Sequence, residues 1–108
     1  MFLDRDELRA LARQVLGAGG EFSFLASGRS MHPAIRDGER VKVAPLGEEG
    51  PIVGEVVLYE GAGGRMLLHR VVELGEEGRV QLRGDARPSM DEWVERERVV
   101  GRVVALGD

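Results

Sequence analysis

The sequence contains no cysteine, which excludes disulfide bonds, thiolate nucleophiles and zinc sites built on cysteine. It also has no apolar run near the ~20 residues that a membrane-spanning helix needs, since runs such as residues 56–59 are far shorter. Asp4 and Asp6 stand where a secretory signal would carry basic residues and then an apolar stretch. We therefore expect a cytoplasmic protein with neither a transmembrane segment nor a signal peptide.

Charge of either sign is in no large excess. The 108 residues include 15 basic and 19 acidic side chains, which gives a formal net charge of −4. Because the arginines are dispersed among acidic residues, we expect no basic face and no nucleic-acid partner. Hydrophobic residues make up 43% and charged residues 31%, a balance typical of a globular protein. This length favours a single domain over residues 1–108.

The first segment with a clear period is an amphipathic helix predicted over residues 4–16. Asp4 can cap it, and Glu7 completes a possible capping box three residues later. Gly17 is expected to end it. The helix should pack over a β core or lie against a partner. Its predicted apolar stripe consists of Leu8, Leu11 and Val15.

After residue 20 the apolar pattern changes to the alternation of short strands separated by glycine-rich turns. Residues 75–78 predict a hairpin turn between two of these strands. Such a pattern favours a mostly β core over residues 21–107, built as a small, bent antiparallel sheet or partly open barrel. The predicted strands are residues 21–25, 40–43, 55–59, 66–74, 79–83 and 99–106.

Residues 27–33 are the first segment that indicates chemistry. Ser30 follows a strand and enters a loop whose shape is restricted by Pro33, so its hydroxyl can be exposed at the sheet edge. Gly28 lets the backbone approach a substrate closely. The alternative is an ordinary turn without a functional serine.

Two later segments supply an imidazole and two carboxylates. His69 interrupts an apolar strand, and a neutral imidazole is the usual general base for a serine hydroxyl. The alternative is a core histidine bonded to a backbone carbonyl. In residues 84–91, either Asp85 or Asp91 could hold the imidazole ring, although both could instead belong to a simple turn.

In this order, the segments resemble the type I signal peptidase family. The resemblance spans roughly residues 22–106, and it implies a fold of the signal-peptidase catalytic-core type. The matching residues are Ser30-Met31 with Pro33, residues 37–43, residues 54–59, His69-Arg70, Gly84-Asp85 with Asp91, and residues 99–104.

The family divides by the residue that serves as base. The usual bacterial branch has a lysine before the arginine, whereas the archaeal and endoplasmic-reticulum branch has a histidine. With His69 before Arg70, this sequence resembles the second branch. Lys42, the sole lysine, lies in the predicted strand after the serine, which argues against a Ser-Lys dyad.

The resemblance implies a role for each residue. Ser30 is the nucleophile, and His69 takes its proton and later passes it to the leaving amine. Asp91 is the better candidate for the third member, with Asp85 bracing the site, for example by pairing with Arg70. The two aspartates could also have the reverse roles.

The oxyanion hole is expected to use the Ser30 N–H. Gly28 stands where many relatives have a serine, which leaves the second donor open. His32 is expected either to line the substrate groove or to lie on the surface. No metal and no cofactor are expected. The residues assigned to oxyanion or substrate binding are Gly28, Arg29, Met31, His32 and Pro33.

We therefore expect a serine endopeptidase that cleaves signal- or leader-like peptides bound as an extended strand. The alternative is a catalytically inactive peptide-binding module with the same fold. A third reading is a small structural β domain whose motifs occur by chance. The sequence does not predict the oligomeric state or the natural substrate.

Overall fold

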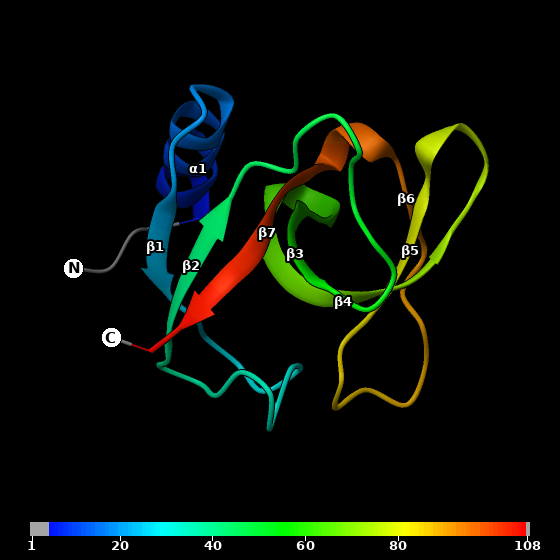
Figure 1. Cartoon of the computed structure of the whole chain (residues 1–108). Coiled ribbons are helices and arrows are strands. Elements are labelled where there is room, and N and C mark those ends of the chain that lie inside the picture. Colours follow the sequence, from blue (N-terminus) through cyan, green and yellow to red (C-terminus); the bar gives the residue numbers. More distant parts are fainter. Residues whose placement is uncertain (1–4, 108) are drawn as a thin grey trace.

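The computed structural model describes residues 5–107, which form one α-helix, seven β-strands and three short 3-10 helices (Figure 1). The helix is α1 (Arg5–Gly17), and the 3-10 helices are Ala62–Gly64, Glu76–Gly78 and Arg96–Arg98. The strands are β1 (Phe22–Leu25), β2 (Arg40–Ala44), β3 (Val56–Glu60), β4 (Met66–Leu74), β5 (Val80–Arg83), β6 (Trp93–Val94) and β7 (Val99–Leu106).

All seven strands belong to one antiparallel sheet in the order β1-β2-β7-β3-β4-β5-β6. The prediction of a mostly β protein with one N-terminal helix is therefore confirmed, and the sheet is not closed into a barrel. The last strand, β7, lies between β2 and β3 and so joins the two halves of the sheet (Figure 1). Register shifts occur in the pairings of β2 with β7, β3 with β7 and β4 with β5, and such irregularities bend a sheet.

The core consists of two apolar clusters. Leu58 of β3 belongs to one cluster and its neighbours Val57 and Tyr59 to the other, because successive side chains of a strand point to opposite faces. All three are buried, so β3 is covered on both faces. The first cluster contains Ala12, Leu16, Phe22, Ala26, Met31, Ile35, Val41, Val43 and Leu58. The second contains Leu46, Val57, Tyr59, Val71, Val80, Leu82, Val94 and Val99.

The helix packs against β1, β4 and β7, and Leu8 and Val15 of the predicted stripe lie against the first core cluster together with Ala12 and Leu16. Ala12 and Leu16 are buried, whereas Leu11 is 37% exposed, so the assignment of Leu11 to the packed face was wrong. Because Ala12 faces the sheet, the adjacent Leu11 points away from it. Gly101 of β7 helps this approach, because a Cβ there would lie 3.1 Å from the Leu16 Cδ1. The helix ends at Gly17 as predicted, and the Asp4 cap lies outside the described residues.

The predicted strands are confirmed with small changes at their ends, and one strand was missed. β6 has two residues, Trp93 and Val94, which is too short for an alternating pattern to appear. It pairs with β5 and begins two residues after Asp91. The predicted hairpin turn is present between β4 and β5, with Glu77 at a positive φ of 59°. No helix among residues 5–107 is both long enough and apolar enough to cross a membrane.

An arginine on β7 fixes the long connection between β2 and β3. The Arg102 Nε donates to a Glu55 carboxylate oxygen at 2.9 Å, and its Nη atoms donate to the carbonyls of Leu46 (3.1 Å) and Gly50 (2.9 Å). Arg102 and Glu55 are each only 19% exposed at the side chain, so the ion pair is largely withdrawn from water. This network holds residues 46–55, whose Gly54 carbonyl contacts the site described next.

Candidate active site

Ser30 begins a tight turn that follows β1. The turn is closed by the hydrogen bond from the Ile35 N–H to the Met31 carbonyl, and Met31 itself is 4% exposed in the first core cluster. Burial of the Met31 side chain fixes the chain next to Ser30, which is itself half-buried. The hydroxyl of Ser30 is thereby held by an anchored turn rather than by a free loop.

His69 lies in the middle of β4 and is 4% exposed. Its Nε2 is 3.1 Å from the Ser30 Oγ, and its Nδ1 is hydrogen-bonded to the Asp91 Oδ2. Because an ionised carboxylate only accepts hydrogen bonds, Nδ1 is the protonated nitrogen, and a neutral ring then leaves Nε2 as an acceptor for the serine hydroxyl. The structure thus brings together Ser30, His69 and Asp91 from three distant segments, in the arrangement of a serine–histidine–aspartate triad.

Tyr59 is a fourth member of this group that the sequence did not predict. Its hydroxyl donates to the Asp91 Oδ2 at 3.0 Å and lies 3.0 Å from the His69 Nδ1. Burial raises the pKa of Tyr59, and the charge of Asp91 raises it further, so the hydroxyl keeps its proton and remains a donor. Val57 is the partner of His69 across β3 and β4, which places Tyr59 diagonally on the same face. The chain's single tyrosine, at the end of an apolar strand, was the available signal, since a buried Tyr hydroxyl needs a partner.

Asp85 does not contact the imidazole and instead pairs with Arg70. The Arg70 Nε and Nη2 donate to the two Asp85 oxygens at 2.9 and 2.7 Å, and its Nη1 donates to the Gly54 carbonyl at 2.7 Å. The hydrogen bond from Arg70 holds the pKa of Asp85 below its ordinary value of 3.8, and the same bond raises the pKa of Arg70. Of the two aspartates left open by the sequence, Asp91 is the one that contacts His69.

The segment from Gly84 to Asp91 is bonded directly to the serine turn. The Ala86 N–H donates to the Ser30 carbonyl at 2.8 Å, and the Asp85 N–H lies 3.3 Å from the Met31 Sδ. A Cβ at Gly84 would lie 2.7 Å from the Ser30 carbonyl oxygen and 3.1 Å from the His69 Nε2. Only glycine therefore allows this close approach of the loop, the serine turn and the imidazole.

The backbone donors near Ser30 differ in their availability. The Gly28 N–H donates to the Asp37 carboxylate at 2.9 Å, so it is already used in this structure. Within residues 5–107 the Ser30 N–H donates to no protein acceptor. The expectation that Ser30 contributes an oxyanion donor fits this geometry, whereas Gly28 does not supply the second one here.

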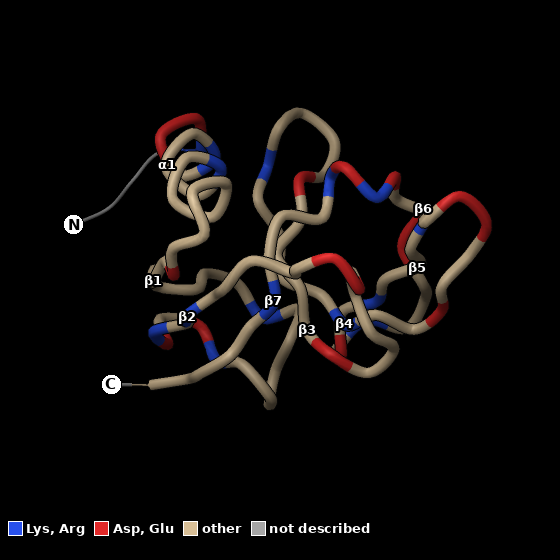
Figure 2. The backbone as a smooth tube through the Cα atoms, turned by 45° about the horizontal axis from the view of Figure 1, so that its top comes forward, with Lys and Arg blue, Asp and Glu red and all other residues tan. Residues whose placement is uncertain are grey.

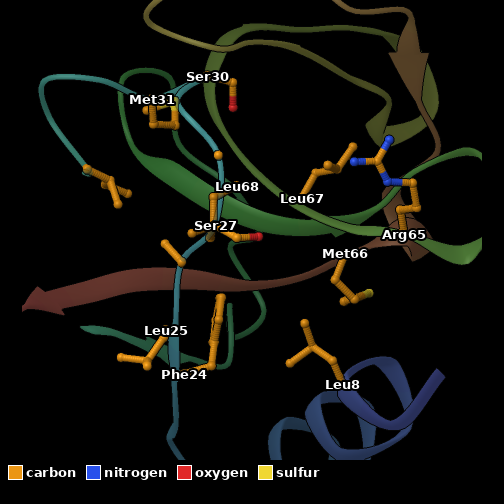
Figure 3. Close-up of a pocket in the computed structure, with 13 residues that line it drawn as sticks. Leu8, Phe24, Leu25, Ser27, Ser30, Met31, Arg65, Met66, Leu67 and Leu68 are labelled. Carbon is orange, nitrogen blue, oxygen red and sulfur yellow. The ribbon is translucent and has the colours of Figure 1, made fainter. Parts of the chain in front are cut away.

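Two pockets flank Ser30. The smaller, of about 110 Å³, is lined mainly by apolar residues, and Figure 3 shows Leu8 projecting toward it from α1. The larger, of about 280 Å³, contains His69 and Asp91. Residues shared by both pockets are Ser27, Gly28, Ser30, Arg65 and Leu67.

The remaining residues assigned to substrate binding are divided between the pockets and the surface. Met31 lines the smaller pocket and Arg29 the larger one. His32 and Pro33 are exposed and line neither pocket, so of the two places expected for His32 the structure shows the surface. The turn directs Met31 into the core and therefore carries the next two residues outward. In the described part of the chain, no group of three histidine, aspartate or glutamate side chains is close enough to hold a metal ion.

Comparison with protein-family models and with curated proteins gives no relative from which a function could be transferred. No protein-family model matches the chain, and no curated protein matches it. Any function assigned to the chain therefore rests on the geometry of Ser30, His69, Asp91 and their neighbours.

The Arg70–Asp85 pair predicts a pH-dependent contribution to stability. Asp85→Asn should lower the free energy of unfolding by about 1 kcal/mol at pH 7, a modest value because both side chains are partly exposed. A carboxylate whose pKa is lowered by folding stabilises the protein above its unfolded pKa and loses that contribution as the pH falls through the folded pKa. The difference between wild type and variant should thus be constant well above pH 3.8 and shrink below it.

Urea unfolding at a series of pH values measures this difference. Glu92→Gln, which neutralises an exposed carboxylate in the next segment, is the control and should leave the free energy of unfolding nearly unchanged. A difference for Asp85→Asn that stays the same at the lowest pH at which the protein is folded would contradict the role given to the Asp85 charge.

Proposed function

We propose that this protein is a serine endopeptidase that cleaves signal- or leader-like peptides, related to the histidine branch of the type I signal peptidases. The observation that carries the proposal is the chain of contacts from Ser30 through His69 to Asp91, with 3.1 Å between the Ser30 Oγ and the His69 Nε2. This distance is within the range in which a base takes a proton from a serine hydroxyl.

The proposed reaction is acyl transfer in two steps. His69 Nε2 takes the Ser30 proton while Oγ attacks the carbonyl carbon of the peptide, and the Ser30 N–H donates to the oxyanion that forms. His69 then gives the proton to the leaving amine, and the C–N bond breaks to leave an ester on Ser30. Water attacks this ester with His69 again as base, which releases the acid and restores the serine.

Asp91 and Tyr59 are proposed to act on the imidazole rather than on the substrate. The Asp91 carboxylate holds the tautomer with the proton on Nδ1 and stabilises the imidazolium formed during each step. Tyr59 donates to the same oxygen and thereby fixes the carboxylate. Since His69 is buried in a strand, little reorganisation of these groups is needed as the reaction proceeds.

The substrate is proposed to lie extended across Ser30, with an apolar side chain in the smaller pocket. That pocket is lined mainly by apolar residues, and it begins directly beside the hydroxyl. An extended peptide would add main-chain hydrogen bonds to specificity from such pockets. The apolar residues that line this pocket are Leu8, Phe24, Leu25, Ala26, Met31, Ile35, Met66, Leu67 and Leu68.

One observation favours an inactive peptide-binding module as the second candidate. The Gly28 N–H is bonded to Asp37, so the site as described offers one backbone oxyanion donor, from Ser30. Loss of a single oxyanion donor costs about 10²–10³-fold in rate in a serine peptidase. A protein with the same pockets and without turnover would bind the same peptides but leave them intact.

An electrophilic probe for activated serines should label the wild type and not the Ser30→Ala or His69→Ala variants. Ser89→Ala is the matched control, because Ser89 is exposed and lines neither pocket. Hydrolysis of a peptide pool, followed by mass spectrometry, should fall by at least about 10³-fold in Ser30→Ala. Equal labelling of wild type and Ser30→Ala would contradict the proposal, and peptide binding without wild-type hydrolysis would favour the inactive module.

The two aspartates should differ in their effect on hydrolysis of the best peptide. Asp91→Asn should lower kcat/KM by up to about 10⁴-fold, because the imidazole loses the acceptor for its Nδ1 proton. Tyr59→Phe should cost about tenfold, from the loss of one hydrogen bond to that carboxylate. Asp85→Asn makes the same chemical change in the same segment but contacts Arg70, so its loss should be smaller than that of Asp91→Asn. A larger loss for Asp85→Asn would reverse the roles of the two aspartates.

A further inference from the structure

Three arginines line the larger pocket beside the proposed triad. Arg29 directly precedes Ser30, Arg65 directly precedes β4, and Arg87 lies in the segment before Asp91; all three are exposed. In Figure 3, Arg65 and Ser30 lie on two different chain segments that border the site. We call this cavity the arginine pocket.

The three guanidinium groups have no partner in the described part of the chain. No carboxylate within residues 5–107 forms an ion pair with any of them. The protein has 19 acidic and 15 basic side chains, and charges of both signs are spread along the backbone (Figure 2). What distinguishes Arg29, Arg65 and Arg87 is that all three line one pocket. Other arginines do have carboxylate partners, namely Arg9 with Asp6, Arg13 with Glu60, Arg70 with Asp85, and Arg102 with Glu55 and Glu49.

The pocket has an excess of positive charge. Its lining includes a single carboxylate, that of Asp91, and one oxygen of this group already accepts from both His69 and Tyr59. The charge of Arg87 reaches Tyr59, which lines the same pocket, because it opposes the rise that burial causes in the pKa of Tyr59. Three unpaired cations around one bonded carboxylate make a local positive potential that attracts anions to the pocket.

Resting on the proposed function, we propose that the arginine pocket binds a carboxylate of the peptide substrate, supplied by an aspartate or glutamate side chain. Guanidinium groups suit this ligand because their fork of N–H donors matches the two oxygens of a carboxylate. The two pockets meet at Ser30, and most of the residues that line the smaller one are apolar. A substrate across Ser30 therefore has an apolar residue on one side of the cleaved bond and an acidic residue on the other.

The test measures binding and cleavage separately. Each peptide has an apolar residue on one side of the cleaved bond. On the other side, a single Glu or Gln is placed at each position in turn. Every peptide is made with a free and with an amidated C-terminus. Binding to Ser30→Ala is followed by fluorescence anisotropy, because this variant gives an affinity without turnover. Cleavage of the same peptides by the wild-type protein is followed by mass spectrometry.

The best Glu peptide should bind about tenfold more tightly than its Gln counterpart at low salt, and the preference should weaken at high salt because exposed charges are screened. Added to Ser30→Ala, Arg65→Gln or Arg87→Gln should each reduce the preference by about two- to fivefold. Arg65→Lys and Arg87→Lys keep the charge and should retain more of it. Arg98→Gln removes an exposed arginine that lines neither pocket and should leave the preference unchanged.

Equal affinity for Glu and Gln peptides would overturn the inference, and so would a preference that survives both arginine-to-glutamine changes, or no binding at all. A preference that depends on the free C-terminus alone would support a carboxylate site, but one that binds the C-terminal carboxylate of the peptide instead of an acidic side chain. Tighter binding of Glu peptides without wild-type cleavage would uphold the arginine pocket and count against the peptidase. Cleavage of the Glu and Gln peptides without a difference in affinity between them would support the peptidase and count against the arginine pocket.

Discussion

The structure around the candidate site depends on one buried imidazole. His69 stands in a strand with apolar neighbours and is almost inaccessible to water, so each of its ring nitrogens needs a partner within the protein. Asp91 and Tyr59 meet this need at Nδ1, and Ser30 meets it at Nε2. The same contacts that satisfy a buried polar group therefore bring a hydroxyl, an imidazole and a carboxylate into line.

The segment between β5 and β6 makes this convergence possible. Backbone bonds join it to the serine turn at the Ser30 carbonyl, and Gly84 leaves room for the turn and the imidazole to meet. Its two aspartates have separate partners, because Asp85 is held by Arg70 on the neighbouring position of β4 and Asp91 by His69. Since adjacent residues of a strand point to opposite faces, one pair braces the segment from outside while the other lies at the pocket.

Much of this arrangement follows from local sequence, and the remainder depends on tertiary contacts. Alternation and glycine turns predicted six of the strands and the hairpin at residues 75–78, because these signals lie within a few residues of each other. Ser30 was recognised from its place in a loop restricted by Pro33, and His69 from its place as a polar residue in an apolar strand. The two-residue β6 is too short to show an alternating pattern. Leu11 was predicted to be packed in place of Ala12 because its larger apolar side chain gave the stronger signal in a short stripe. The partner of the Tyr59 hydroxyl and the bond from Gly28 to Asp37 depend on tertiary contacts that no local pattern encodes.

The state of the His69 ring tests the central arrangement most directly. The chain has only two histidines, and the exposed His32 serves as an internal reference in a long-range ¹H–¹⁵N correlation spectrum. When its ring is neutral, we expect His69 to carry its proton on Nδ1, in slow exchange with water, and to lose that protection in Asp91→Asn. A proton on Nε2, or exchange as rapid as that of His32, would contradict the account.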